Sequence, residues 1–132
     1  MLADMMARVN RDVGIKSDSC MANLYRDGDD SVCAHKDGDW MHPTIATVVL
    51  ADAQGARHLC FRRDAAERGE LSWKLNTGHG DLVVDKGSAE KWKHWVPKSK
   101  AVRGRRLSLT FRQMTNVQNE LPGMAQEQVS LF

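Results

Sequence analysis

The sequence predicts a mainly β domain of the jelly-roll kind that begins with one short helix. Three observations support this fold class. The chain has 132 residues, which is room for one hydrophobic core. From Met21 onward it consists of short runs of strand-forming residues separated by glycine and aspartate turns. Eight such runs match the strand count of a closed double sheet, which is how a jelly roll limits its exposed edges.

The first expected element is a short amphipathic helix over residues 2–12. Its apolar side chains recur from Leu2 to Val9 at the spacing i, i+3, i+4 and i+7, which places them on one helix face. Gly14 is positioned to end the helix. Two methionines, Met5 and Met6, contribute to this stripe, and we expect them to be ordinary core residues.

Eight strands are expected after the helix. Their predicted ranges are 21–25, 31–36, 44–50, 58–62, 72–75, 81–84, 93–96 and 106–112. The Arg-Asp-Gly-Asp-Asp segment at 26–30 is expected to be a tight hairpin turn, because Asp-Gly supplies the positive φ angles that such turns require. Residues 113–132 have weak periodicity. We therefore expect a folded core over residues 1–112 and a C-terminal tail over 113–132.

Composition favours a soluble globular protein, with 42% hydrophobic and 27% charged residues. The longest mostly apolar run, 44–51, is much shorter than the roughly 20 residues of a membrane-spanning helix. The start of the chain lacks the basic region of a secretory signal. We expect an intracellular, cytoplasmic monomer without membrane contact. Cys20, Cys33 and Cys60 include no Cys-x-x-Cys pair, which argues against a disulfide framework and a cysteine-rich zinc site.

Positive charge is concentrated in residues 86–112, which contain nine basic residues and one acid. Clustered basic side chains create a local field that a polyanion such as single-stranded nucleic acid can exploit. A solvated basic loop is the alternative interpretation.

A candidate metal site begins with the His35-Lys36-Asp37 segment. Side chains alternate faces along a strand, so His35 and Asp37 project together. The best third ligand is His94, which stands between two tryptophans on a predicted strand. Two histidines and a carboxylate form the facial triad of non-haem Fe(II) oxygenases. A polar surface pair is the alternative for residues 35 and 37. The other histidines weighed as ligands are His42, His58 and His79, and the last two are expected to be structural or solvent-facing.

The predicted strand 106–112 alternates polar and apolar residues. Its polar face consists of Arg106, Ser108, Thr110 and Arg112. If that face points inward, its two guanidinium groups need anionic partners, because an unpaired buried charge is strongly unfavourable. A dicarboxylate would satisfy both through bidentate contacts. A solvated polar face is the alternative.

Asn23 and Tyr25 form a further pair on one face of a predicted strand. Their amide and phenol groups suit the ends of a small polar ligand.

These motifs together resemble the AlkB-like family of Fe(II)- and 2-oxoglutarate-dependent dioxygenases, which repair or demethylate nucleic acids. Five segments resemble the family's motifs in their order, and they are 23–28 (Asn-Leu-Tyr-Arg-Asp-Gly), 35–39 (His-Lys-Asp-Gly-Asp), 80–84 (Gly-Asp-Leu-Val-Val), 92–98 (Trp-Lys-His-Trp-Val-Pro-Lys) and 106–112 (Arg-Leu-Ser-Leu-Thr-Phe-Arg). The resemblance extends from about residue 2 to residue 112.

The resemblance implies a double-stranded β-helix, the cupin-like form of the jelly roll. It also implies a catalytic Fe(II) ion held by His35, Asp37 and His94, with 2-oxoglutarate as co-substrate and dioxygen as oxidant. By the same resemblance, Arg106 pairs with the distal carboxylate of 2-oxoglutarate with help from Tyr25.

The resemblance further implies that Arg112 and Asn23 serve the carboxylate end of the co-substrate near the metal. Ser108 stands where the family commonly has asparagine. A serine still donates a hydrogen bond, so weaker co-substrate binding is expected rather than its loss.

The implied reaction is oxidative demethylation of N-alkylated bases in single-stranded DNA or RNA, or of a base flipped out of a duplex. Asp39 resembles the acidic position that contacts the base edge, and Trp40 is placed to stack on a base, with ordinary packing as its alternative. Two other functions stay open. They are a 2-oxoglutarate-dependent hydroxylase of a protein or small molecule, and a non-catalytic jelly-roll module that binds nucleic acid.

Overall fold

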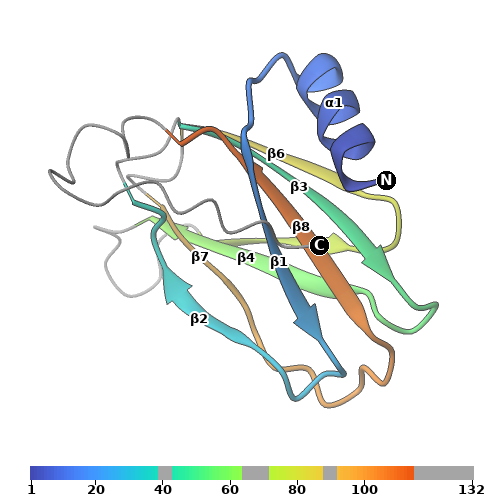
Figure 1. Ribbon diagram of the computed structural model, residues 1–132. Coiled ribbons are helices and arrows are strands. Elements are labelled where there is room, and N and C mark those ends of the chain that lie inside the picture. Colours follow the sequence, from blue (N-terminus) through green and yellow to red (C-terminus); the bar gives the residue numbers. More distant parts are fainter. Residues whose placement is uncertain (39–42, 64–71, 88–91, 115–132) are drawn as a thin grey trace, which may run out of the picture.

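A computed structural model describes residues 1–38, 43–63, 72–87 and 92–114 of the chain (Figure 1). Its elements are α1 (Leu2–Val13), β1 (Ser19–Tyr25), β2 (Val32–His35), β3 (Thr44–Ala51), β4 (Arg57–Arg63), β5 (Ser72–Thr77), β6 (Leu82–Lys86), β7 (Trp92–Val96) and β8 (Arg106–Arg112). The helix and all eight strands were predicted from the sequence, with ends that differ by at most two residues. Within the described ranges, the one helix is too short to cross a membrane.

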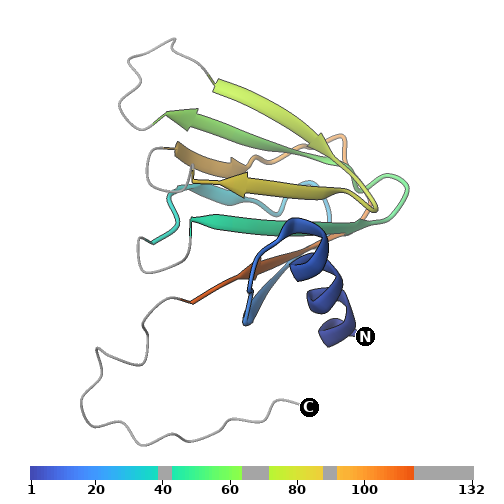
Figure 2. The ribbon, with the colours of Figure 1, turned by 90° about the horizontal axis from the view of Figure 1, so that it is seen from above.

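The strands form two four-stranded antiparallel sheets. The first has the order β1-β8-β3-β6 and the second the order β2-β7-β4-β5. They lie as two layers, with α1 on the outer side of the first sheet (Figure 2). This arrangement confirms the predicted mainly β, double-stranded β-helix fold.

The hydrophobic core lies between α1 and the first sheet. Val9 and Ile15 pack there against Leu109 and Phe111, which lie on the outer face of β8. Met5 and Met6 pack at the margin of this cluster, so the methionine stripe is core as expected. Because side chains alternate along a strand, the other face of β8 points between the two sheets. The helix therefore buries the apolar side of β8 and directs its polar side inward.

The turn at residues 26–30 is not the hairpin that the sequence led us to expect. β1 and β2 belong to different sheets, so this segment crosses from one layer to the other. Gly28 does not adopt a positive φ. A side chain at this position would instead collide with the segment before β8, because an added Cβ would lie 1.8 Å from the carbonyl oxygen of Ser99. The glycine is required by close packing, which the local Asp-Gly signature does not distinguish from a hairpin turn.

Gly28→Ala is therefore expected to lower the free energy of unfolding by about 3 kcal/mol, the upper end of the usual range for overpacking, because backbone atoms must move. Gly78→Ala is the matched control, since its Cβ would meet Ala56 at an ordinary 3.7 Å. Urea denaturation followed by tryptophan fluorescence measures both variants. An equal decrease in the free energy of unfolding of both variants would show that the close contact with Ser99 is not what requires a glycine at position 28.

Candidate metal centre

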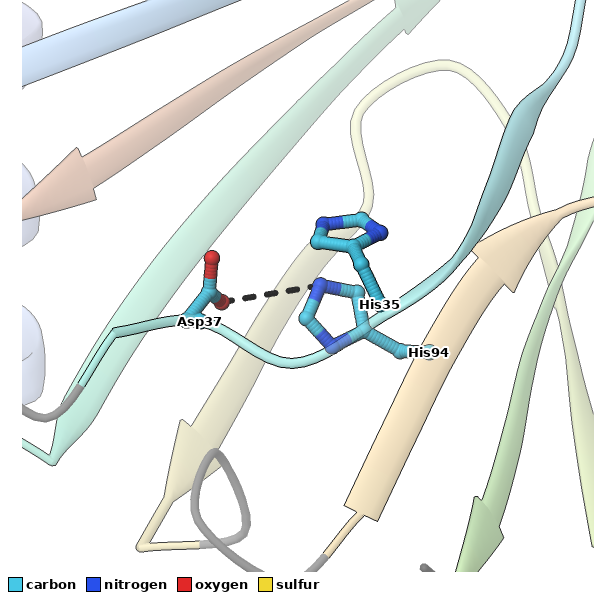
Figure 3. Close-up of side chains that lie close together, drawn as sticks. All are labelled: His35, Asp37 and His94. Atoms are coloured by element: carbon cyan, nitrogen blue, oxygen red, sulfur yellow. Dashed lines mark ion pairs between the residues drawn. The ribbon is translucent and has the colours of Figure 1, made fainter.

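Three predicted ligands, His35, Asp37 and His94, lie together at one end of the space between the sheets (Figure 3). Their ligand atoms all lie within 4.8 Å of one another. The arrangement follows from strand pairing, because His35 on β2 is directly opposite His94 on β7 and the ring centroids are 4.4 Å apart. Asp37 follows β2 by two residues and turns its carboxylate toward His94.

The imidazole of His35 is oriented by its own strand. Its Nδ1 lies 2.8 Å from the carbonyl oxygen of Cys33. A carbonyl oxygen only accepts hydrogen bonds, so Nδ1 carries the proton and donates it there. The Nε2 lone pair is then available for a metal ion, which is the arrangement that second-layer contacts commonly impose on metal-binding histidines.

Asp37 is held by contacts to both of its carboxylate oxygens. Its Oδ1 forms an ion pair with Arg112 Nη2 at 3.0 Å, and its Oδ2 lies 3.5 Å from His94 Nε2. The Asp37 side chain is only 7% exposed. A buried carboxylate requires compensating charge, which Arg112 supplies from β8.

Burial lowers the pKa of His94, while the negative charge of Asp37 acts in the opposite direction. The neutral imidazole is the form that binds a metal ion. Desolvation therefore favours the ligating form of His94. Two imidazole nitrogens and one carboxylate oxygen are the donor set suited to Fe(II) with open coordination positions.

A cavity of about 130 Å³ between the sheets extends from these three residues. The proposed co-substrate residues line it from β1 and β8, and they are Asn23, Tyr25, Arg106, Ser108 and Arg112. The register of these two strands places Tyr25 opposite Arg106 and Asn23 opposite Ser108. The structure thus brings every described site residue predicted from the sequence to one cavity.

Arg106 is buried with incomplete hydrogen bonding. Its side chain is 2% exposed, and its Nη2 donates to Thr77 Oγ1 at 3.2 Å. Within the described part of the chain, its Nε and Nη1 have no hydrogen-bond partner. The guanidinium lies over the Tyr25 ring, 5.1 Å from the centroid. Burial lowers the pKa of Arg106. Unsatisfied donors on a buried cation are costly, so this position fits a carboxylate ligand such as one end of 2-oxoglutarate.

Arg57 is a buried arginine that the sequence interpretation missed. It is 2% exposed and donates to the carbonyl oxygens of Asp27 at 2.9 Å, Asp30 at 2.8 Å and Pro97. These contacts attach the crossing segment 26–30 to the end of β7. The predicted strand began one residue later, at His58. Extending the alternation of Leu59 and Phe61 back by one step would have placed Arg57 on the inner face.

Three other predicted positions fall outside the described residues: Asp39 and Trp40, assigned to substrate contacts, and His42. The two remaining histidines lie apart from the metal cluster, as expected. His58 is exposed on β4. His79 belongs to the turn before β6, where its Nδ1 accepts a hydrogen bond from the Ala51 N–H at 3.2 Å.

Comparisons with known proteins agree with this geometry. The family model of the 2OG-Fe(II) oxygenase superfamily matches residues 1–112. The chain is 29% identical over 115 residues to alpha-ketoglutarate-dependent dioxygenase alkB homolog 3 of Rattus norvegicus, covering 82% of this chain and 39% of that protein. Its identity to the Homo sapiens protein of the same name is 29% over 119 residues, covering 84% and 41%. The chain thus spans about two fifths of the length of these curated relatives.

The fold also resembles a solved structure, that of OsALKBH1. The TM-score is 0.58 at 21% sequence identity, and the match covers 75% of this chain and 49% of that chain. This similarity supports the double-stranded β-helix architecture.

Proposed function

Since the chain belongs to the AlkB-like 2OG-Fe(II) oxygenases, we propose that it catalyses oxidative demethylation of N-alkylated bases in DNA or RNA. Family membership implies Fe(II) as the metal, with 2-oxoglutarate and dioxygen as co-substrates. In this proposal His35, Asp37 and His94 bind the iron, and Arg106 binds the distal carboxylate of 2-oxoglutarate with Tyr25. Asn23, Ser108 and Arg112 complete the co-substrate site.

The observation that carries the proposal is one cavity that contains both the His-Asp-His cluster and a buried arginine with unsatisfied donors. Iron bound there would couple the oxidative decarboxylation of 2-oxoglutarate to activation of dioxygen, which is the oxidising chemistry that demethylation needs. The chain itself contributes position, since Arg106, which is buried between the sheets, orients the co-substrate.

The proposed substrate is a methylated base in a single strand, or one flipped out of a duplex, because a base within a stacked duplex does not reach a site between two sheets. The positive charge of residues 86–112 supports a polyanionic substrate. The relatives named alkB homolog 3 support the same reaction class. In this proposal Asp39 contacts the base edge and Trp40 stacks on the base.

Incubation of the purified chain with Fe(II), ascorbate and 2-oxoglutarate tests the proposal. The substrates are single-stranded oligonucleotides that contain 1-methyladenine or 3-methylcytosine. For each substrate-dependent succinate formed, we expect one methylated base to become the unmethylated base, with a loss of mass equal to one CH2 unit and release of the methyl carbon as formaldehyde. Succinate without a change in base mass would favour a hydroxylase of a protein or small molecule. Oligonucleotide binding without succinate would favour a non-catalytic module.

A further inference from the structure

We propose that the second sheet, β2-β7-β4-β5, is a binding surface for single-stranded nucleic acid that leads to the metal centre. Phosphates contact Arg62, Lys74 and Lys93 on its outer face, and a base stacks on Trp73 at its edge. This inference rests on the proposed function, because it places the polynucleotide that the reaction would act on.

The four strands of this sheet contain basic residues and no acidic ones. The described strand residues include Arg57, Arg62, Arg63, Lys74 and Lys93, with no aspartate or glutamate. Arg57 is buried and bonded to backbone carbonyls. The other four lie toward the end of the sheet that contains the metal centre.

Strand register gathers three of these cations on the outer face. Arg62 is directly opposite Lys93 on β7, and Lys74 is opposite Cys60, which precedes Arg62 by two residues on β4. The Arg62 guanidinium lies 6.0 Å from the centroid of the Trp95 ring. Arg62 and Lys74 are exposed, so this face presents cationic groups to a polyanion.

The inner face of the same sheet contains a row of rings that begins at the surface and ends at the metal centre. Trp73 is opposite Phe61, Phe61 is opposite His94, and His94 is opposite His35. The ring centroids of Trp73 and Phe61 are 5.3 Å apart, and those of Phe61 and His94 are 6.2 Å apart. A single cross-strand row therefore connects the edge strand to the proposed iron ligands.

Trp73 is the exposed end of this row. It lies on the edge strand β5 and is 51% exposed, with its ring edge-on to Trp92 at 5.6 Å. Lys74, the next residue, faces the opposite side of the same strand. A polynucleotide that passes over the edge of β5 can therefore contact the Trp73 ring and the ammonium group of Lys74, which are adjacent in sequence.

This combination selects a single strand. Cations that follow the phosphates, together with an aromatic side chain on which a base stacks, are the recurring chemistry of single-strand binding. A duplex keeps its bases stacked on each other and would use only the cations. A single free nucleotide bound in the cavity would not contact the cations on the outer face of the sheet.

Fluorescence anisotropy with an unmethylated, labelled single-stranded oligothymidylate tests the cations. Combining Arg62→Ala, Lys74→Ala and Lys93→Ala should reduce the slope of log affinity against log salt by about 2, because each phosphate contact on a single strand contributes about 0.7. The matched control combines Arg8→Ala, Arg11→Ala and Lys16→Ala, which are exposed on the side of α1. The control should keep the slope of the parent protein. An unchanged slope in the sheet variant, or an equal reduction in the control, overturns the assignment of phosphates to this sheet.

The stacking contact has a different signature in the same assay. Trp73→Ala should weaken binding about 5- to 100-fold at every salt concentration, from the roughly 1–3 kcal/mol of one stacked base, without changing the slope. Trp73→Phe should recover part of the affinity. Leu82→Ala is the control, an exposed apolar residue on β6 of the other sheet. If Trp73→Ala binds as tightly as Leu82→Ala, the stacking assignment is wrong.

The two proposals fail separately. Binding of an unmethylated oligonucleotide does not require catalysis. If the protein shows the expected salt slopes but removes no methyl group, only the proposed reaction is excluded. If it removes methyl groups and the sheet variants bind as tightly as the parent protein, only the proposed binding surface is excluded.

Discussion

His94→Ala is expected to abolish 2-oxoglutarate-dependent succinate formation, with a loss of at least about 100-fold. The variant removes one of the three side chains of the proposed iron site, whose candidate ligand atoms all lie within 4.8 Å of one another. Changes to residues that merely support a metal ligand already cost about 10- to 100-fold in metal affinity or activity, so loss of a ligand should cost more. Succinate formation at saturating 2-oxoglutarate, measured over a range of Fe(II) concentrations, provides the test.

His58→Ala is the matched control for this variant. It removes an exposed imidazole from β4, a strand adjacent to β7, and leaves the metal cluster intact. We expect parent-level succinate formation from it. Activity of His94→Ala equal to that of His58→Ala would exclude His94 as a metal ligand.

Arg106→Lys is expected to raise the concentration of 2-oxoglutarate needed for half-maximal turnover by about 10- to 100-fold. This range corresponds to the roughly 1.5–3 kcal/mol of a hydrogen bond to a charged group. A lysine retains the positive charge, but its single ammonium group cannot form the planar bidentate contact that a guanidinium makes with a carboxylate. Arg105→Lys is the control, since Arg105 is exposed and pairs with Asp52 outside the cavity. An unchanged requirement in Arg106→Lys would remove this residue from the co-substrate site.

Thermal unfolding separates a ligand-binding role of Arg106 from a structural one. Arg106→Met removes a buried cation whose Nε and Nη1 lack partners in the described structure, so the variant without ligand should be at least as stable as the parent. The parent should gain about 2.7 kcal/mol at a 2-oxoglutarate concentration 100 times its Kd. The variant should not gain this stabilisation. Strong destabilisation of the ligand-free variant would indicate that Arg106 mainly supports Thr77 and Tyr25.

Much of the site could be predicted because its signals are local. Alternation along β8 separates the cavity-facing Arg106 and Ser108 from Leu109, which packs beneath α1. The same period of two places His35 and Asp37 together. His94 was predicted as the third ligand from its position on a strand between two tryptophans. The pairing of that strand with β2, which brings His94 opposite His35, is not encoded in any local pattern.

The turn at 26–30 and Arg57 show where local patterns were insufficient. Gly28 is required by the Ser99 carbonyl, and that contact forms only when distant segments pack together. The partners of Arg57 are backbone carbonyls of Asp27, Asp30 and Pro97. Alternation along β4 places Arg57 on the inner face, but backbone acceptors have no residue-type signature, so the sequence pattern does not show which groups hold this arginine.

Metal binding tests the central claim most directly. Anaerobic equilibrium dialysis with Fe(II), in the presence of 2-oxoglutarate, gives the number of ions bound per chain. We expect one ion for the parent protein and for His58→Ala, and none for Asp37→Ala or His94→Ala at the same free iron concentration. Equal iron binding by all four proteins, or no saturable binding by the parent, would contradict the assignment of His35, Asp37 and His94 as a metal site.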